Sequence, residues 1–241
     1  MQRIDTPEIL DSDACSPVDA QAVLEAIERV NRWFGGIATT QKMVEGVARA
    51  SGSNRFSLLE VAGGLGKVPR MARENLARRG ITLGVTLLDI AASHLHGGNS
   101  SSNHSGGNQG VVADALALPF ADGAFDLVSC NLFAHHLEPR RLQQFMREGL
   151  RVSRCALLIN DLVRHPMHLA LAYAGYPIIR NRVAWLDGLT SVRRAYTPAE
   201  IRSMLADDSS PAISARVEIS RHFLFRMGVI VWKMRAQRRP S

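Results

Sequence analysis

One short segment constrains the fold of this chain more than any other feature of its sequence. Residues 58–67 read Leu-Leu-Glu-Val-Ala-Gly-Gly-Leu-Gly-Lys, so an apolar run that contains Glu60 passes directly into a glycine-rich turn. Glycine lets the backbone turn sharply and approach a ligand closely, and a carboxylate at the end of a strand can accept hydrogen bonds from an amine or a hydroxyl. The segment therefore predicts a β-strand over 57–61 that ends at a site for a nucleotide-type ligand.

The spacing of the glycines argues against a dinucleotide. A turn that binds a pyrophosphate has the spacing G-x-G-x-x-G, whereas here Ala62 precedes Gly64 and Gly66, and Pro69 stands in the third place. Ala62 adds a methyl group at the first position of the turn, so we expect its φ to be negative. A pyrophosphate site is therefore disfavoured.

Two further acids follow apolar runs downstream. Asp89 ends the run that begins at Ile81, and Asp114 follows the run 111–113. In open α/β sheets the ligand lies outside the carboxyl ends of the parallel strands. We therefore expect Glu60, Asp89 and Asp114 to converge on one crevice.

Strand-like and helical patterns alternate along the chain, which predicts an α/β fold with a mostly parallel sheet. The predicted elements are helices over 17–32, 39–50, 68–79 and 139–152 and strands over 57–61, 82–88, 110–113, 125–130 and 155–160. The sequence Thr197-Pro198-Ala199-Glu200 begins a further helix, because threonine, proline and glutamate hold the positions of a capping box. The last two strand-like runs cover 215–224 and 227–234.

The composition is that of one large domain with additions. A chain of 241 residues that is 46% hydrophobic and 21% charged can bury one sizeable core. The two leading helices would form an N-terminal cap over 1–55, and we expect the first few residues to be disordered. The main domain, 56–241, contains an insertion at 93–110 that is rich in glycine, serine and asparagine and is expected to be flexible, and a helical insertion at 162–195.

Over about 56–161 the chain resembles the class I S-adenosylmethionine-dependent methyltransferases, in particular the small-molecule type (methyltransferase type 11) related to the quinone-biosynthesis methylases. The most telling part is 114–126, which reads Asp-Ala-Leu-Ala-Leu-Pro-Phe-Ala-Asp-Gly-Ala-Phe-Asp and is similar to the family's signature around its third and fourth strands. The resemblance implies a Rossmann-like, seven-stranded, mostly parallel sheet with helices on both faces. The last two strand-like runs would then form an antiparallel C-terminal hairpin at its edge.

The resemblance also implies S-adenosylmethionine as the cofactor, with a set of contacts for it. Glu60 and the glycine-rich turn would hold the methionine part, the end of the second strand the ribose, the end of the third strand the adenine, and the end of the fourth strand would face the sulfonium. The matching residues here are Glu60, Ala62, Gly63, Gly64, Gly66, Asp89, Ile90, Asp114, Ala115 and Asn131.

Two adjacent histidines are the candidate catalytic residues. Methyl transfer from a sulfonium is an in-line displacement, so the protein has chiefly to align the reacting groups, and a general base is needed only when the acceptor arrives protonated. His135 and His136 directly follow the strand predicted over 125–130, and imidazole suits proton removal near neutrality. Packing at a helix start is the alternative for both, and His135 is favoured because it lies nearer the strand.

The candidate contacts to the acceptor come from helical segments outside the predicted parallel strands. They are Trp33 and Phe34 at a helix junction, Arg164 and His165 after the fifth strand, and Tyr173 in the apolar insertion. Ordinary packing, or a polar helix start capped by Asp161, explains them as well. The apolar insertion suits a small lipid-like, quinone-like or polyketide-like acceptor, methylated at oxygen.

Two other functions compete with small-molecule methylation. The net charge of +7 makes methylation of nucleic acid one competing hypothesis. However, the arginines are spread along the chain, residues 131–134 lack the Asn/Asp-Pro-Pro-aromatic run of amino-methylating enzymes, and no cysteine follows a proline as in base-carbon methylation. We therefore expect no nucleic-acid partner. A cofactor-binding partner protein without catalysis is the other alternative, and the intact acids argue against it.

The cysteines and the lengths of the apolar runs indicate in which cellular compartment the protein is expected. Cys15, Cys130 and Cys155 show no C-x-x-C spacing and lie in different segments, which indicates free thiols and a reducing cytoplasm. No apolar run approaches the roughly 20 residues that span a bilayer, and the N-terminus lacks the pattern of a secretory signal. We expect no integral membrane segment, and the oligomeric state is left open.

No metal site is expected from the sequence. The histidines of the predicted flexible insertion, His94, His96 and His104, have no cysteine or carboxylate beside them. A mobile loop therefore explains them better than a set of metal ligands.

Overall fold

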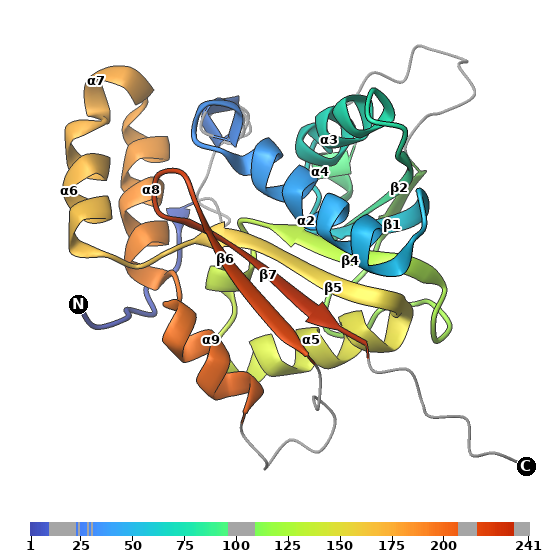
Figure 1. The fold of residues 1–241 in the computed structure, drawn as a ribbon. Helices are drawn as coiled ribbons and strands as arrows, with labels where there is room; N and C mark the ends of the chain where they lie inside the picture. Colours follow the sequence, from blue (N-terminus) through green and yellow to red (C-terminus); the bar gives the residue numbers. More distant parts are fainter. Residues whose placement is uncertain are drawn as a thin grey trace, which may run out of the picture.

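The computed structural model describes residues 1–9, 23, 25–27, 29, 31–95, 109–206 and 216–233. Its strands are β1 Arg55–Val61, β2 Thr82–Asp89, β3 Gln109–Val112, β4 Phe125–Asn131, β5 Ser153–Leu162, β6 Val217–His222 and β7 Arg226–Trp232. They form one seven-stranded sheet in the order β3-β2-β1-β4-β5-β7-β6 (Figure 1). The first five strands pair in parallel, and β7 runs antiparallel to both β5 and β6. The predicted Rossmann-like sheet with an antiparallel C-terminal hairpin is confirmed.

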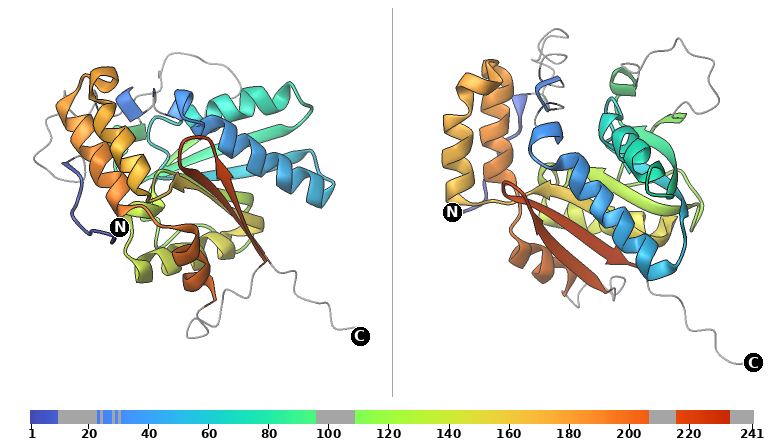
Figure 2. Two further views of the ribbon diagram at one scale, coloured as in Figure 1. Left: turned by 60° about the vertical axis from the view of Figure 1, so that its left-hand side comes forward. Right: turned by 45° about the horizontal axis from the view of Figure 1, so that its top comes forward.

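Helices cover both faces of the sheet and its carboxyl edge. They are α2 Gly36–Ser51, α3 Lys67–Ala77, α4 Ala92–Leu95, the 3₁₀ helix η2 Ala134–His136, α5 Pro139–Val152, α6 Pro166–Ala174, α7 Tyr176–Ile179, α8 Arg182–Arg194 and α9 Pro198–Leu205. Figures 1 and 2 show α2 and α3 on one face, α5 and α9 on the other, and α6 to α8 beyond the carboxyl ends of the parallel strands. Of the helices in the described ranges, none is long and apolar enough to cross a membrane.

The central strands are buried on both faces, which is why they read as continuous apolar runs. Leu59 and Val128 belong to a core cluster that includes residues of α5 and α9, whereas Leu58 and Leu127 belong to a second cluster that includes residues of α2 and α3. Successive side chains of a strand point to opposite faces, so each strand feeds both clusters. The carboxyl ends of the strands are therefore held from both sides.

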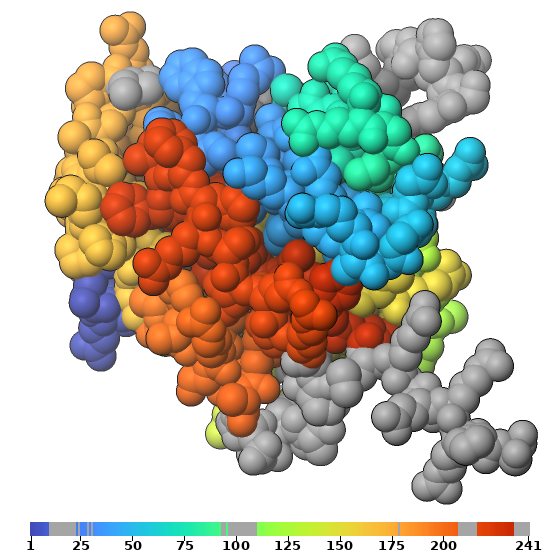
Figure 3. Space-filling model, viewed as in Figure 1, coloured from blue at the N-terminus to red at the C-terminus, as the bar shows by residue number. Residues whose placement is uncertain are grey.

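Helix α2 is fixed to the sheet by one buried polar residue of β5. The side-chain nitrogen of Asn160 donates to the Gly36 carbonyl oxygen at 2.7 Å and to Thr40 Oγ1 at 2.8 Å. In Figure 3, α2 lies directly beside the β6–β7 hairpin on the face shown. The helix predicted from Thr39 begins earlier, at Gly36, because Gly35 takes a left-handed conformation with φ 79° and turns the chain there.

Two predicted segments extend beyond the described residues. In the helix predicted over 17–32, the described residues are helical, and the others lie outside the described part of the chain. The insertion predicted to be flexible is bounded by α4 and β3, and its residues 96–108 also lie outside the described part.

The N-terminal residues 1–9 pack against the domain, so the prediction that the chain begins in disorder is wrong for them. Arg3 Nε donates to the carbonyl oxygen of Arg194 at 2.7 Å, and the backbone N–H of Ile9 donates to Asp187 Oδ1 at 2.7 Å. Glu8 is buried. The contacts are mainly polar and reach α8, which is remote in sequence, so local apolar periodicity gives no sign of them.

Candidate functional site

A pocket of about 270 Å³ opens at the carboxyl ends of β1, β2 and β4, the edge where the sequence predicts a ligand. This volume is close to the lower end of ordinary small-ligand sites. The lining includes the turn 62–66, the start of α3 and side chains from strand ends and from the N-terminal segment. The polar and aromatic side chains that matter most are Glu8, Glu60, Asp89, Asn131, Phe133 and His136.

The glycine-rich turn forms a tight backbone cradle between β1 and α3. Gly64 and Gly66 have φ values of 49° and 66°, and the Gly63 N–H donates to the Leu88 carbonyl oxygen at 3.1 Å. Ala62 has a φ of 53°, so the predicted negative φ is wrong. A residue with a Cβ loses about 1–2 kcal/mol in the left-handed conformation. The turn therefore imposes strain on Ala62 that a glycine would avoid.

Glu60, near the end of β1, places a fully buried carboxyl group at the pocket. Its side chain is 2% exposed, and the Ser129 hydroxyl of β4 donates to it. Burial raises the pKa of Glu60 to about 7, against the opposing effect of the Ser129 hydrogen bond. This group can therefore accept a hydrogen bond from a ligand amine once it is ionised.

Asp89, at the end of β2, presents a second carboxylate to the same pocket. It is 5% exposed, and its Oδ2 accepts from the Gly64 N–H at 3.0 Å while its Oδ1 accepts from the Ala91 N–H at 3.2 Å. These bonds tie the carboxylate to the glycine-rich turn. The structure thus brings Glu60 and Asp89 together, as predicted for the strand ends.

The third predicted acid does not line this pocket. Asp114 is exposed, and its Oδ1 accepts from the Leu116 N–H at 2.8 Å, which closes a local turn after β3. Ala115 packs against the core, and Ile90 is 74% exposed. The convergence of three acids on one pocket is therefore seen for two of them, and the contacts of Asp114, Ala115 and Ile90 with a cofactor stay predictions.

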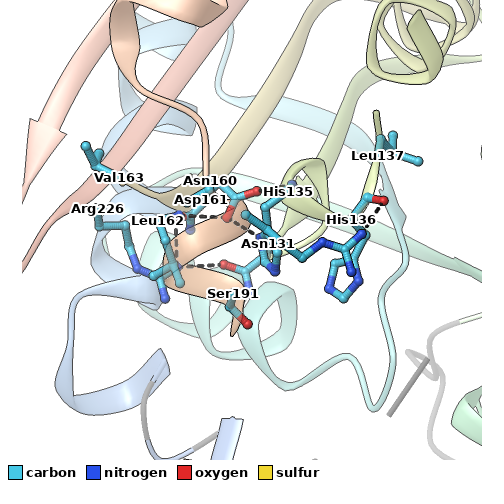
Figure 4. Close-up of polar contacts among 12 residues, drawn as sticks. Asn131, His135, His136, Leu137, Asn160, Asp161, Leu162, Val163, Ser191 and Arg226 are labelled. Atoms are coloured by element: carbon cyan, nitrogen blue, oxygen red, sulfur yellow. Dashed lines mark hydrogen bonds and ion pairs between the residues drawn. The ribbon is translucent and has the colours of Figure 1, made fainter. Parts of the chain in front are cut away.

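Asn131 lines the pocket and is oriented by a buried arginine that the sequence analysis missed. Arg226 of β7 is 1% exposed, and its NH1 donates to Asn131 Oδ1 at 3.0 Å and to Asn160 Oδ1 at 2.9 Å (Figure 4). Its NH2 donates to Asn31 Oδ1 at 2.8 Å. Burial lowers the pKa of Arg226 to about 10, opposed by the charge of Asp161. The only sequence signal was one arginine inside an apolar run.

The two predicted catalytic histidines have different environments. His135 is 2% exposed and does not line the pocket; its backbone N–H donates to Asp161 Oδ2 at 3.0 Å, and its Nδ1 lies 2.7 Å from Asp161 Oδ1 (Figure 4). Burial alone would lower the pKa of His135, but the charge and hydrogen bond of Asp161, together with Glu8, raise it to about 10. His136 does line the pocket. The preference for His135 is therefore reversed, because η2 turns His135 into the interior.

Glu8 joins the two histidines at the pocket, and sequence reasoning missed it. Its Oε1 lies 3.3 Å from His135 Nε2 and accepts from the Ser191 hydroxyl at 2.6 Å, and its Oε2 lies 3.8 Å from His136 Nε2. Burial opposes ionisation, but the neighbouring histidines and Ser191 hold the pKa of Glu8 below its ordinary value. A single acid in a polar, aperiodic segment carries no signal that would have identified it.

The five predicted acceptor contacts lie outside the lining of the pocket. Trp33 is 58% exposed, and Phe34 follows it at the helix junction. His165 stacks on Phe225 with ring centroids 4.9 Å apart, and Tyr173 packs edge-on against Trp185.

Arg164 is also committed to the fold. It pairs with Glu200, and its NH1 donates to the Ala195 carbonyl oxygen at 2.8 Å. Its guanidinium therefore stabilises the start of α9, and an acidic acceptor at this residue is disfavoured. Asp161, expected as a helix cap, instead accepts hydrogen bonds from His135.

The strand order, the antiparallel β7 and a ligand pocket at the carboxyl ends of β1 and β2, with an acid near each end, define a class I methyltransferase. Residues 59–155 match the family model described as a methyltransferase domain. Residues 59–155 carry this domain, and the activity that it indicates is S-adenosylmethionine-dependent methyl transfer. No curated protein sequence matches the chain.

Solved structures of low sequence identity share the fold. The plantazolicin methyltransferase BpumL in complex with SAH is 13% identical, with 94% of this chain and 93% of that chain covered and a TM-score of 0.70. A SAM-dependent methyltransferase from Aquifex aeolicus is 14% identical over 90% and 98% of the two chains, with a TM-score of 0.57. Human N-acetylserotonin methyltransferase in complex with SAM is 12% identical over 89% and 56%, with a TM-score of 0.59.

Proposed function

We propose that the chain transfers the methyl group of S-adenosylmethionine to an oxygen atom of a small apolar or aromatic acceptor that binds in this pocket. One observation carries the proposal: a single cavity joins the acids and the turn of a cofactor site to an apolar wall and to the Glu8–His136 side chains. Methyl transfer requires the sulfonium and the acceptor to be aligned in a water-poor space. A shared cavity of this kind supplies the alignment, because it places both ligands side by side.

In the proposed complex the cofactor occupies the side of the pocket formed by β1 and β2. Ionised Glu60 accepts hydrogen bonds from the methionine amine, and Asp89 accepts them from the ribose hydroxyls. The turn 62–66 lies against the methionine part, and the Asn131 amide faces the sulfonium. The distances from Arg226 to Asn131 and from Gly64 to Asp89 support these roles, because they show that both side chains are held in place at the pocket.

The acceptor occupies the remaining part of the cavity. Ile27, Leu132 and Phe133 give it an apolar wall, which suits a ring or a chain of carbon atoms. A phenolic or enolic hydroxyl would meet Glu8 and His136, and there it would lose its proton. In this arrangement His136 is the residue that faces the acceptor, and His135 positions Glu8 from behind.

The proposed setting is the reducing cytoplasm, with no nucleic-acid partner. Cys130 and Cys155 are free thiols, and Cys130 is buried; Cys15 lies outside the described residues. Support for a small acceptor comes from BpumL, whose structures include complexes with monoazolic and triazolic desmethylPZN analogs.

The test uses cofactor that carries a labelled methyl group. The purified chain is incubated with this cofactor and a panel of phenols, naphthols, hydroxyquinones and short polyketides, and products are detected by mass. We expect one class of hydroxylated aromatic to gain the label at oxygen, and Asp89→Ala to weaken cofactor binding. Label that appears only on added RNA or duplex DNA, or cofactor binding without any labelled product, would contradict the proposal.

A further inference from the structure

We propose that Glu8, His135 and His136 together bind one divalent transition-metal ion at the polar end of the pocket. We call these three residues the His–His–Glu cluster. The cluster combines two imidazoles and one carboxylate, which is a ligand set that suits zinc, iron(II) and cobalt(II). The proposal departs from the expectation of no metal, which considered only the histidines of the insertion 93–110.

The spacing of the ligand atoms suits a small cation. The Glu8 Oε1 and His135 Nε2 atoms are 3.3 Å apart, the Glu8 Oε2 and His136 Nε2 atoms are 3.8 Å apart, and one ligand atom from each residue lies within 4.8 Å of the others. Ligands that are about 2.0–2.2 Å from one ion lie roughly 3–3.5 Å apart at tetrahedral or octahedral angles. The first distance fits, and a small movement of the partly exposed His136 would bring the others into range.

The ring of His135 presents one nitrogen to this position without a well-formed hydrogen bond. Among the described residues, His135 Nε2 is buried, and Glu8 Oε1 contacts it at 3.3 Å as an ion pair. A buried polar atom without a partner carries a free-energy cost, and such atoms in native proteins call for an explanation. A metal ion at Nε2 would supply the missing partner.

The other nitrogen of the same ring is held by a carboxylate. His135 Nδ1 lies 2.7 Å from Asp161 Oδ1, and Asp161 is buried (Figure 4). A histidine that binds a metal commonly donates its other N–H to a carboxylate, which fixes the tautomer and the direction of the ligand nitrogen. The carboxylates of Glu8 and Asp161 also place two negative charges around one imidazole, which favours a cation at its free nitrogen.

The cluster is open toward the pocket, because Glu8 and His136 belong to its lining. Three protein ligands leave one or more positions on the ion for water or a substrate oxygen, as in catalytic rather than structural zinc sites. If the acceptor carries a hydroxyl, its oxygen would bind there, the ion would lower the pKa of that hydroxyl, and the proton would pass to water in the pocket, because Glu8 and His136 would then serve as ligands instead of as the base. This last role rests on the proposed function, whereas metal binding itself does not.

Cobalt(II) is the probe, because its visible bands report coordination by nitrogen and oxygen ligands. The titration is done without cofactor or acceptor, in a background in which His94, His96 and His104 are replaced by asparagine, so that the insertion cannot bind the ion. We expect one equivalent of cobalt per chain, displaced by zinc. Because no methyl transfer is measured, the result is independent of the proposed function.

Matched variants identify the ligands. Glu8→Gln and His136→Gln should each raise the dissociation constant for cobalt at least about tenfold, and Asp161→Asn should raise it about 10–100-fold by releasing the His135 ring. His165→Gln and His168→Gln alter histidines outside the cluster and should leave it unchanged. Thermal melting without metal identifies any variant that fails to fold.

Three outcomes would overturn the proposal. They are no cobalt bands at one equivalent, a dissociation constant that is the same in Glu8→Gln and the parent, or binding that disappears with His165 or His168 instead. In each case the cluster would be a buried ion-pair network around a protonated His135. Methyl transfer that persists after chelation would show that a bound ion is not needed for the reaction, while the cobalt result alone decides the binding site.

Discussion

The carboxyl group of Glu60 is the single ionisation that most directly affects the proposed cofactor site. Its folded-state pKa is about 7, raised by burial from an ordinary value of 4.5. Above pH 7 the group is mainly a carboxylate, which in the proposed complex attracts the ammonium of the methionine part. Below pH 7 it is mainly neutral, and this attraction is lost.

We therefore expect the affinity for S-adenosylmethionine to rise by up to about tenfold between pH 6 and pH 8, because the ionised fraction of Glu60 rises from roughly one-tenth to nine-tenths. Calorimetry at several pH values measures it. The α-amino group of the ligand also titrates near pH 7.7–8, so Glu60→Gln is the control. Its affinity should be lower and should show only the pH dependence of the ligand. Parallel curves for the two proteins would exclude Glu60 from the amine site.

The same raised pKa has an opposite effect on the unliganded protein. A carboxyl group whose pKa is raised by folding adds stability that is complete below its unfolded pKa of about 4.5 and is lost as the pH rises through about 7. Thermal melting without cofactor should therefore show the parent losing stability between pH 6 and pH 8 relative to Glu60→Gln. An equal pH dependence of the two melting temperatures would contradict the burial of a neutral carboxyl group.

Ala62 is a second residue whose local conformation can be tested. Because its φ is 53°, Ala62→Gly should relieve strain and stabilise the protein by about 1 kcal/mol, after the larger entropy of the unfolded glycine is subtracted. Ala48→Gly, inside α2, is the matched control and should destabilise by about 1 kcal/mol. Urea unfolding measures both. A loss of stability in Ala62→Gly comparable with that of the control would show that the turn is not strained.

At the scale of single elements, two helical glycines differ in what surrounds them. In α5, a Cβ on Gly149 would lie 2.9 Å from Leu157 Cδ1 of β5, whereas a Cβ on Gly188 in α8 would meet nothing within 4 Å. Gly149 thus allows α5 to approach the sheet closely. Gly188 has no such packing role among the described residues.

Gly149→Ala should therefore destabilise the protein by about 1–3 kcal/mol, because the added methyl group would overlap the fully buried side chain of Leu157, so that this side chain leaves its rotamer or α5 shifts. Gly188→Ala should stabilise it by about 0.5–1 kcal/mol through helix propensity alone. Denaturant midpoints at constant m-value separate the two effects. Equal shifts in the same direction would show that the α5–β5 contact is looser than described.

The helices and strands also show which sequence signals were sufficient to predict the structure. The capping box at Thr197 and Glu200 is present in α9, since all of its partners are within a few residues, and α5 has the predicted bounds because its buried face has helical spacing. Arg226 and Glu8 were not predictable in this way. Their partners lie at least 66 residues away along the chain, so only the assembled sheet brings them together.

At the scale of the whole molecule, the sheet order and the cofactor side of the pocket followed from local signals repeated along the chain. The acids Glu60 and Asp89 are at strand ends, where the topology alone brings them together. The proposed acceptor side was not predictable, because the N-terminal segment and η2 contribute to it and are held there, together with α8, by hydrogen bonds from side chains to distant backbone carbonyl oxygens. Arg3 NH2, for example, donates to the carbonyl oxygens of His135 and Leu137, both at 3.1 Å.

This division of the pocket predicts that its two sides can be separated by one truncation. Removal of residues 2–9 takes away Glu8 and the Arg3 bridge to η2 and α8, but leaves Glu60, Asp89 and the glycine-rich turn. We expect the affinity for S-adenosylmethionine to change less than about twofold and methyl transfer to fall by about 10²-fold, the size of effect associated with losing a group that handles the acceptor proton. The rate of methyl transfer by Arg3→Ala in the full chain should lie between those of the parent and the truncated protein, because Glu8 is kept while the N-terminal segment that carries it is held less firmly. Loss of residues that serve only the acceptor should leave the strand ends, and therefore cofactor binding, intact. If the truncated protein lost cofactor binding as fully as turnover, the N-terminal segment would belong to the cofactor site or to the fold itself.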